Sequence, residues 1–392
     1  MALCPFKPIG SDSYRMRNRK TIIFSARDAA AALYAAPIIE EASRDERFCV
    51  VVVAQEPALN ILVRRGIRPI AVELPPANDL LGSQAAALLT QAERILQQVN
   101  PDVIIAGLSS PGQGGIDEAL LRMRSCRGFL LQDFWGEWNG FFGRKPDLFL
   151  VLDEAAATLT RAAHDTECVV VGSTRHAEYA GLEIPKLRQS ARERIGSSGR
   201  PVIGWFGQAL HHLPGYAKSI AAWSRSIRDF PVTADVIYKP HPRESEEQRR
   251  QALETMQDSL PRVHFLEAWP IEDALLLCDC VCAVMSNCLY DAAYLNFHSQ
   301  QPLVTPVAML HSAELHMDLS SKISFEALPY VALGLAKVAL PGNDLSAQLF
   351  AAMGDDDKRD CWQAAKNNLA DPELATARIL DLIASHASEN RP

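Results

Sequence analysis

The sequence predicts an α/β protein made of two similar halves, each a parallel sheet covered by helices. Runs that are apolar throughout, such as 48–54 (FCVVVVA) and 102–107 (DVIIAG), alternate with longer segments of helical periodicity. Strands without polar alternation are typical of a parallel sheet with helices on both faces. The length of 392 residues also favours two domains, at roughly 150 residues each.

The first half opens with the apolar run 21–25 (TIIFS) and the alanine-rich segment 28–42, which indicate a strand and then a helix. The same alternation continues to residue 172 and is that of a Rossmann-like βαβ series. We expect strands at 21–25, 48–54, 67–73, 102–107, 128–132, 147–152 and 168–172, and helices at 28–42, 57–65, 83–98, 116–124 and 153–163.

A second series of the same kind follows residues 186–200 (KLRQSARERIGSSGR), which are polar, end in a Gly/Ser cluster and indicate a linker. We expect strands at 201–206, 234–238, 262–266, 280–284 and 302–304, and helices at 216–227, 244–257, 270–277 and 287–295. The expected organisation is a flexible leader over 1–20, a first domain over 21–185, the linker, a second domain over 201–355, and helices over 356–392 that pack back toward the first domain.

Composition and charge exclude several classes of protein. Thirty-nine basic and 47 acidic side chains give a net charge of −8, without the basic excess expected of a protein that binds nucleic acid. No run approaches about 18 apolar residues, and the N-terminus lacks the order of a signal peptide. The nine cysteines are odd in number and lie mostly in apolar stretches, which argues against a disulfide framework. We therefore expect a soluble cytoplasmic protein with no transmembrane segment.

The most distinctive segment is YKPHPRE, residues 238–244, between a predicted strand and a predicted helix. Its two prolines stiffen the turn, and Lys239, His241 and Arg243 together with the helix N-terminus suit an anion. The alternative is a rigid turn with solvated charges.

Two further turns of the second half lead to the same predicted sheet edge. After 280–284, Ser286 and Asn287 can cap the next helix or hold a phosphate. After 201–206, Gly207 permits close backbone approach, and of the adjacent His211 and His212 we expect at most one to contact substrate.

Three loops of the first half also follow predicted strands. Arg27 and Asp28 follow the first strand, and SSPGQGG (109–115) matches neither the G-x-G-x-x-G nor the P-loop fingerprint. In QDFWGEWN (132–139), aromatic rings beside two carboxylates suit a sugar with an acid nearby, whereas a buried Trp pair with surface acids is the alternative. As general bases we rank Asp133 and Glu137 first and Asp28 third.

Metal chemistry has little local support. Cys278, Cys280 and Cys282 share a face of a strand but lack zinc-ligand spacing, so we interpret them as core residues. Neither H-E-x-x-H nor G-x-S-x-G is present. We expect no metal and no cofactor.

Taken together, YKPHPRE, the later S-x(3)-Y-D of Ser286 to Asp291, and Pro302 resemble the C-terminal donor domain of GT-B-fold nucleotide-sugar enzymes. The similarity is to capsule and teichoic-acid type transferases and to non-hydrolysing UDP-N-acetylglucosamine 2-epimerases. Two features depart from these families: the serine pair of the transferases is Ser286-Asn287 here, and the Thr-Glu-Arg-rich segment of the epimerases is not found after Pro302. The resemblance implies a GT-B arrangement with a deep interdomain cleft, in which His241, Ser286 and Asn287 contact the donor diphosphate and Asp291 lies nearby.

The sequence thus predicts a metal-independent glycosyltransferase that moves a sugar, or a polyol-phosphate, from a nucleotide-activated donor to a small-molecule or glycan acceptor. A 2-epimerase and a non-catalytic nucleotide-binding protein are the alternatives, and a homodimer is left open. Expected donor contacts are Gly207, Gln208, Lys239, His241, Arg243, Glu244, Ser286, Asn287 and Asp291; expected acceptor contacts are Arg27, Gly114, Trp135 and Trp138; expected catalytic residues are Asp133, Glu137, Asp28 and His211.

Overall fold

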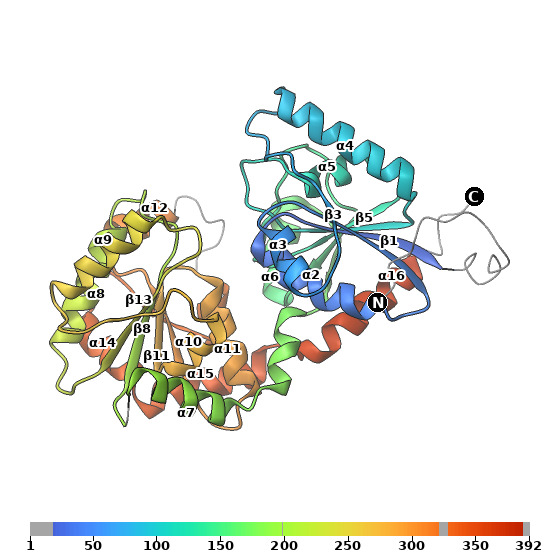
Figure 1. The fold of residues 1–392 in the computed structure, drawn as a ribbon. Helices are drawn as coiled ribbons and strands as arrows, with labels where there is room; N and C mark the ends of the chain where they lie inside the picture. The colour runs from blue at the N-terminus through green and yellow to red at the C-terminus, as the bar shows by residue number, and fades with distance from the viewer. Residues whose placement is uncertain (1–18, 198, 321–327, 387–392) are drawn as a thin grey trace. The chain divides into compact units, whose positions relative to one another are not determined.

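The computed structural model describes residues 19–197, 199–320 and 328–386. The chain forms two compact units: unit 1 comprises residues 1–178 and 370–392, and unit 2 comprises residues 179–369. Each unit holds one parallel sheet with helices packed against it (Figure 1), which confirms the predicted α/β class. Residues 1–18 of the expected leader lie outside the described residues, and Lys20 already belongs to the first strand.

Unit 1 contains a seven-stranded sheet in the order β3-β2-β1-β4-β5-β6-β7. The strands are β1 (Lys20–Ala26), β2 (Phe48–Ala54), β3 (Ile70–Ala71), β4 (Val103–Gly107), β5 (Arg127–Leu131), β6 (Leu148–Val151) and β7 (Cys168–Val170). From β1 the chain adds β2 and β3 on one side and then crosses to add β4 on the other. Ligands of such sheets bind outside the strand C-termini at this reversal, here between β1 and β4.

Helices cover both faces of this sheet. Figure 1 shows α4 and α5 on one face and α2 and α16 on the other. Apolar side chains of α4 and α5, such as Leu88 and Leu120, pack with Ile23 and Ile104 in one buried cluster. The helices of unit 1 are α2 (Ala29–Ala42), α3 (Ala58–Arg64), α4 (Ser83–Val99), α5 (Ile116–Met123), α6 (Glu154–His164) and α16 (Ala375–His386), with short 3-10 helices η1 (Arg175–Gly181), which runs into unit 2, and η2 (Pro372–Leu374).

Unit 2 contains a six-stranded sheet in the order β10-β9-β8-β11-β12-β13, which reverses between β8 and β11. Its core gathers the buried rings of Trp205, Tyr216 and Trp223. The strands are β8 (Val202–Phe206), β9 (Asp235–Lys239), β10 (His264–Phe265), β11 (Cys280–Ala283), β12 (Thr305–Met309) and β13 (Lys337–Ala339). The helices are α7 (Ile184–Ile195), α8 (Tyr216–Arg228), α9 (Glu246–Gln257), α10 (Ile271–Leu277), α11 (Asn287–His298), α12 (Ala313–Ser320), α13 (Pro329–Ala332), α14 (Leu345–Ala352) and α15 (Asp355–Asn368).

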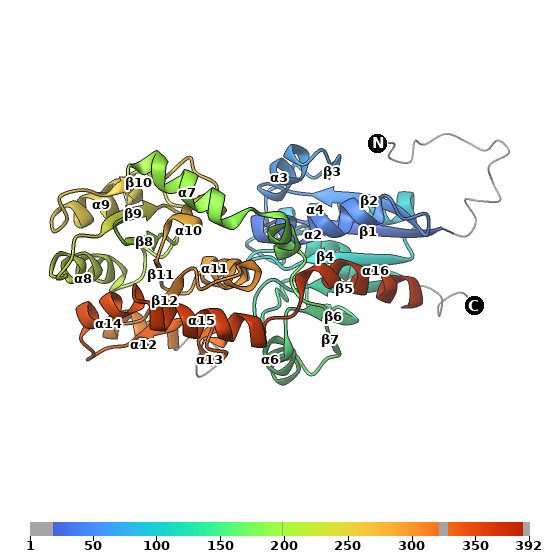
Figure 2. The same ribbon diagram turned by 90° about the horizontal axis from the view of Figure 1, so that it is seen from below.

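The predicted linker over 186–200 is wrong in most of its length, because α7 occupies it and belongs to unit 2. One face of this polar helix is buried through Ile184, Ala191 and Ile195. The predicted return of residues 356–392 to the first domain is also wrong for α15. That helix packs on α11 within unit 2 (Figure 2), whereas α16 packs on α2 in unit 1.

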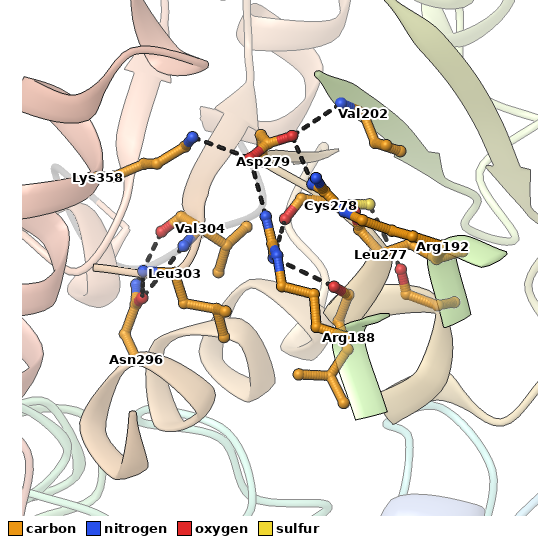
Figure 3. A network of polar contacts seen from close by, with 12 residues as sticks. Arg188, Arg192, Val202, Leu277, Cys278, Asp279, Asn296, Leu303, Val304 and Lys358 are labelled. Carbon is orange, nitrogen blue, oxygen red and sulfur yellow. Dashed lines mark hydrogen bonds and ion pairs between the residues drawn. The ribbon is translucent and has the colours of Figure 1, made fainter. Parts of the chain in front are cut away.

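The strand expected at 302–304 lies instead at 305–309. The backbone N–H groups of Leu303 and Val304 both donate to Oδ1 of Asn296 at 3.2 Å, and the Asn296 amide donates to the Val304 carbonyl at 2.8 Å. These residues are therefore held by a side chain of α11 rather than by a neighbouring strand (Figure 3). The strand that follows includes Pro306, a residue that usually argues against a central strand.

Asp279, directly before β11, binds α7 and α15, the first and last α-helices of unit 2 in the sequence. Its carboxylate accepts from Arg188 at 2.8 Å and Arg192 at 2.6 Å, both of α7, and from Lys358 of α15 at 2.9 Å. It also accepts from the backbone N–H of Val202 at 2.8 Å, as Figure 3 shows. Burial alone would raise the pKa of this carboxyl, but the charges of Arg188, Lys358 and Arg192 outweigh it and lower the pKa.

We expect Asp279→Asn to lower the free energy of unfolding by about 3 kcal/mol, since removing one partner of a buried ion pair leaves charge uncompensated. Because the pKa is lower in the folded state, the stabilisation by Asp279 is present above the pKa of the unfolded chain and is lost as the pH falls through the folded value. Urea unfolding of both proteins at pH 7 and pH 3 measures this, and the difference between their free energies of unfolding should be smaller at pH 3, which lies below the ordinary Asp pKa of 3.8.

The matched control is Glu247→Gln, which removes an exposed carboxylate paired with Arg250 on α9. It should change stability little at either pH. An Asp279→Asn protein as stable as the wild type at pH 7 would contradict the role given to this carboxylate.

Candidate functional site

A buried carboxylate, Glu244, organises the C-terminal edge of the unit 2 sheet. Its side chain is fully buried. Oε1 accepts a hydrogen bond from Nε2 of His211 at 2.7 Å and one from the Tyr238 hydroxyl at 3.1 Å. Oε2 accepts from the backbone N–H of His241 at 2.5 Å. This carboxylate fixes the residues around it, and its expected contact with the donor stays a prediction.

The turn after β8 is tied to both neighbouring strands. The Gly207 N–H donates to the Lys239 carbonyl of β9 at 2.8 Å. Oε1 of Gln208 accepts from the N–H groups of Val284 and Met285, after β11, at 2.9 and 3.0 Å. A Cβ at Gly207 would lie 2.5 Å from Oε2 of Glu244, so only glycine fits there. The side-chain oxygen of Gln208 thus links the turns after β8 and β11, between which the strand order reverses. Both of these hydrogen bonds are made within the protein.

His241 presents one defined hydrogen-bond donor. Its Nδ1 accepts from the backbone N–H of Arg243 at 3.1 Å, so the neutral ring carries its proton on Nε2. Burial, and then the charge of Arg243, lower the pKa of His241 to about 4. At neutral pH the ring is therefore an uncharged Nε2–H donor on a stiff turn.

The two cations of this turn differ in their surroundings. Nζ of Lys239 donates to the backbone carbonyls of Leu266 and Glu267 at 3.1 and 2.9 Å, and burial lowers the pKa of this amine. Arg243 is exposed. Of the two, Arg243 has the more accessible charge for an anion.

The turn after β11 leads directly into α11. Ser286 is the N-cap, and its Oγ accepts from the Cys288 N–H at 3.3 Å. Asn287 is the first residue of the helix, and Asp291 is buried in it at 2% exposure. The N-terminus of a helix of this length favours an anion through its N–H groups and its dipole.

The corresponding edge of unit 1 holds a second polar cluster. The carboxylate of Asp28, after β1, accepts from the N–H and hydroxyl of Ser110, after β4, at 2.8 and 2.6 Å. Nη2 of Arg27 donates to the Ser110 carbonyl at 3.0 Å, and Asn139 donates to the same carbonyl at 3.1 Å. Arg27 is 2% exposed and belongs to the framework of this edge, and its expected acceptor contact stays a prediction.

Asp133, after β5, is the strongest acid–base candidate of this edge. Burial, followed by the charges of Asp28 and Glu137, raises the pKa of Asp133 to about 7. Burial also raises the pKa of Glu137. A carboxyl group that titrates near neutral pH can both accept and donate a proton under working conditions.

Two expected acceptor contacts are occupied inside unit 1. Trp135 is 1% exposed and its Nε1 donates to the carboxylate of Asp153, so its ring offers no stacking face. Gly114 exchanges both of its backbone hydrogen bonds with Ala77 at 2.8 Å. The expected acceptor contacts of Trp135, Gly114 and the half-buried Trp138 stay predictions.

Cys278, Cys280 and Cys282 are fully buried, which confirms their interpretation as core residues. Within residues 19–197, 199–320 and 328–386, no group of three or more His, Cys, Asp and Glu side chains is arranged to hold a metal ion. Over those same residues, no helix is both long and apolar enough to cross a membrane.

Three residues of these clusters lie in segments that the sequence pattern indicated but were not among the expected site residues. Tyr238, Ser110 and Asn139 hold their clusters together, but their partners lie on other strands or loops. The one available signal was that each lies at the end of an apolar run or in the loop that follows one.

Comparisons with known proteins establish the fold. No protein-family model matches the chain, and no curated protein matches it in sequence. Solved structures match over almost the whole chain. A UDP-N-acetylglucosamine 2-epimerase described as putative, from Listeria monocytogenes, has a TM-score of 0.69 at 15% identity, covering 95% of this chain and 98% of its own.

Two other structures show the range of the similarity. The complex of S. aureus MnaA with UDP has a TM-score of 0.66 at 14% identity, covering 95% of this chain and 99% of its own. MurG from Acinetobacter baumannii has a TM-score of 0.56 at 12% identity, covering 94% and 99%. The chain therefore has the GT-B fold that the sequence predicted, which nucleotide-sugar epimerases and glycosyltransferases share.

We expect the free energy of unfolding of Asp133→Asn, relative to that of the wild type, to be higher at pH 8 than at pH 5. The folded wild type keeps a proton on Asp133 up to about pH 7, whereas the unfolded chain loses it near pH 3.8, so the wild type loses stability as the pH rises between these values. Asparagine does not titrate. Urea unfolding at pH 5 and pH 8 measures the difference.

Glu93→Gln, at an exposed position of α4, is the control and should match the wild type at both pH values. An Asp133→Asn effect of the same size at pH 5 and pH 8 would mean that Asp133 does not titrate in this range.

Proposed function

We propose that the protein acts on a nucleotide-activated sugar and cleaves the bond between the sugar C1 and the diphosphate oxygen. The observation that carries this proposal is the fixed Nε2–H donor of His241 on a sheet edge that also holds the N-terminus of α11. Both suit a diphosphate, and the relatives in fold include a complex with UDP and one with UDP-GlcNAc.

Unit 2 would bind the leaving group. As the C1–O bond breaks, its electron pair passes to the diphosphate, whose negative charge grows. His241, Ser286 and the N–H groups of α11 would stabilise that charge without prior rearrangement, because Glu244 and Gln208 already fix the turns. Arg243 would add the accessible positive charge.

Unit 1 would supply the proton chemistry. Asp133, with Asp28 and Glu137 as electrostatic neighbours, would take a proton in the reaction. In a transferase this proton comes from the acceptor hydroxyl that attacks C1. In a 2-epimerase, carboxylates serve the elimination of UDP and its re-addition. His211, whose Nε2 is held by Glu244, would act from unit 2 through its other ring nitrogen, Nδ1.

Sugar transfer and epimerisation are both candidate reactions, because a different observation favours each. The K-x-H-P turn of residues 239–242 resembles the transferases, whereas several of the similar structures are 2-epimerases. Binding without turnover is the third outcome of the tests below.

Incubation with UDP-N-acetylglucosamine alone, followed by ¹H and ³¹P NMR, separates these functions. An epimerase forms the 2-epimer without an acceptor, and a transferase releases UDP only when an acceptor panel is added. We expect one of these two results. Saturable binding without turnover over a panel of UDP-, CDP-, GDP- and dTDP-linked donors with acceptors would contradict the enzymatic proposal.

We expect His241→Ala to weaken UDP binding about ten- to a hundredfold, since a hydrogen bond to a charged group contributes about 1.5–3 kcal/mol. Isothermal titration calorimetry measures the affinity. His241→Asn should recover part of it, because an amide can accept from Arg243 and still donate to the phosphate. His212→Ala, at an exposed neighbouring histidine, is the matched control. Unchanged UDP affinity in His241→Ala would remove His241 from the site.

A further inference from the structure

His311 lies at the same sheet edge as the proposed diphosphate site and was not singled out by any sequence motif. It follows β12, which pairs with β11 through Ala308 and Ala283. Ser286 and His311 each come three residues after these paired positions. Because both strands run in parallel, the two residues leave the sheet at the same edge.

The turn that carries His311 is held on both sides. The Leu310 N–H donates to the Ala339 carbonyl of β13 at 3.0 Å. Oγ of Ser312 accepts from the Leu315 N–H at 3.4 Å, at the start of α12. Ser312 also packs on Gly215, where a Cβ would lie 2.6 Å from Oγ. The position of the His311 backbone is therefore fixed before any ligand binds.

The His311 ring has hydrogen-bonding capacity that the protein does not use. Both ring nitrogens are shielded from solvent, and neither has a hydrogen-bond partner in the part of the chain that the structure describes. Most buried polar side-chain atoms in folded proteins have a partner, because an unsatisfied one is destabilising. Two such atoms on one residue at a candidate binding edge point to a ligand.

We propose that His311 binds two hydroxyl groups of the sugar in the nucleotide-sugar substrate, an inference that rests on the proposed function. A neutral imidazole has one N–H donor and one nitrogen acceptor on different edges of its ring, and two hydroxyl groups of a sugar can satisfy both, one by accepting and one by donating. A phosphate oxygen accepts only, so it would leave one ring nitrogen unsatisfied. Burial lowers the pKa of His311 to about 4, which keeps the ring neutral at pH 7.

The test compares the affinities of UDP and UDP-N-acetylglucosamine by calorimetry in the wild type, His311→Phe and His311→Gln. Phenylalanine fills the space of the ring without hydrogen bonds, and glutamine restores a donor and an acceptor. We expect His311→Phe to leave UDP affinity within about twofold and to weaken UDP-N-acetylglucosamine at least tenfold, about 1.4 kcal/mol. His311→Gln should recover part of the loss, and His212→Phe, at an exposed position, should match the wild type.

Other results would contradict either the sugar contact of His311 or the proposed function. Unchanged UDP-N-acetylglucosamine affinity in His311→Phe, or an equal loss for both ligands, would overturn the sugar contact while the proposed function stands. A wild type that binds neither ligand would contradict a uridine nucleotide as substrate, and this proposal would fall with it. We also expect His311→Phe to unfold at no lower temperature than the wild type, because it removes two unsatisfied nitrogens. If it is destabilised, His311→Gln alone decides: a loss of affinity confined to UDP-N-acetylglucosamine supports the contact, whereas unchanged affinities or an equal loss for both ligands overturns it.

Discussion

The burial of the Glu244 carboxylate is the constraint on which the rest of the unit 2 site depends. This one group receives hydrogen bonds from His211, Tyr238 and the backbone of His241, and it packs against Gly207. Because breaking such a buried network is costly, the turns after β8 and β9 have little freedom to rearrange. The orientation of the His241 ring then follows from the turn itself, so the proposed diphosphate site would need no rearrangement to bind its ligand.

The charge of the protein explains the form of this site. With a net charge of −8, the chain as a whole repels a diphosphate. The unit 2 edge accordingly presents a neutral imidazole donor, a hydroxyl, a helix N-terminus and the exposed Arg243 rather than a broad positive surface. At the unit 1 edge several carboxyl groups lie near one another instead. Burial, followed by the charges of Asp28 and Glu137, raises the pKa of Asp133 to about 7.

Local patterns predicted the fold well where a strand or helix is defined by its own residues. Uninterrupted apolar runs located most strands, and the turns at 238–244 and 285–287 were identified from their composition. Features that depend on distant partners could not be found this way. Arg188 and Arg192 of α7 bind Asp279, which lies 87 or more residues away, so no local pattern could show this contact. Glu244 follows the exposed Arg243 in the sequence. Its side chain is buried against those of His211 and Tyr238, which donate hydrogen bonds to it.

The central claim is that neutral His241 donates from Nε2 to a nucleoside diphosphate. ¹⁵N NMR of histidine-labelled protein at pH 7, with the His241 signals assigned by their loss in a variant, tests it directly. The account predicts a neutral ring protonated on Nε2 whose Nε2 signal shifts on addition of UDP, while Nδ1 keeps the signature of an acceptor. A cationic ring, a proton on Nδ1, or signals that saturating UDP leaves unmoved would contradict it.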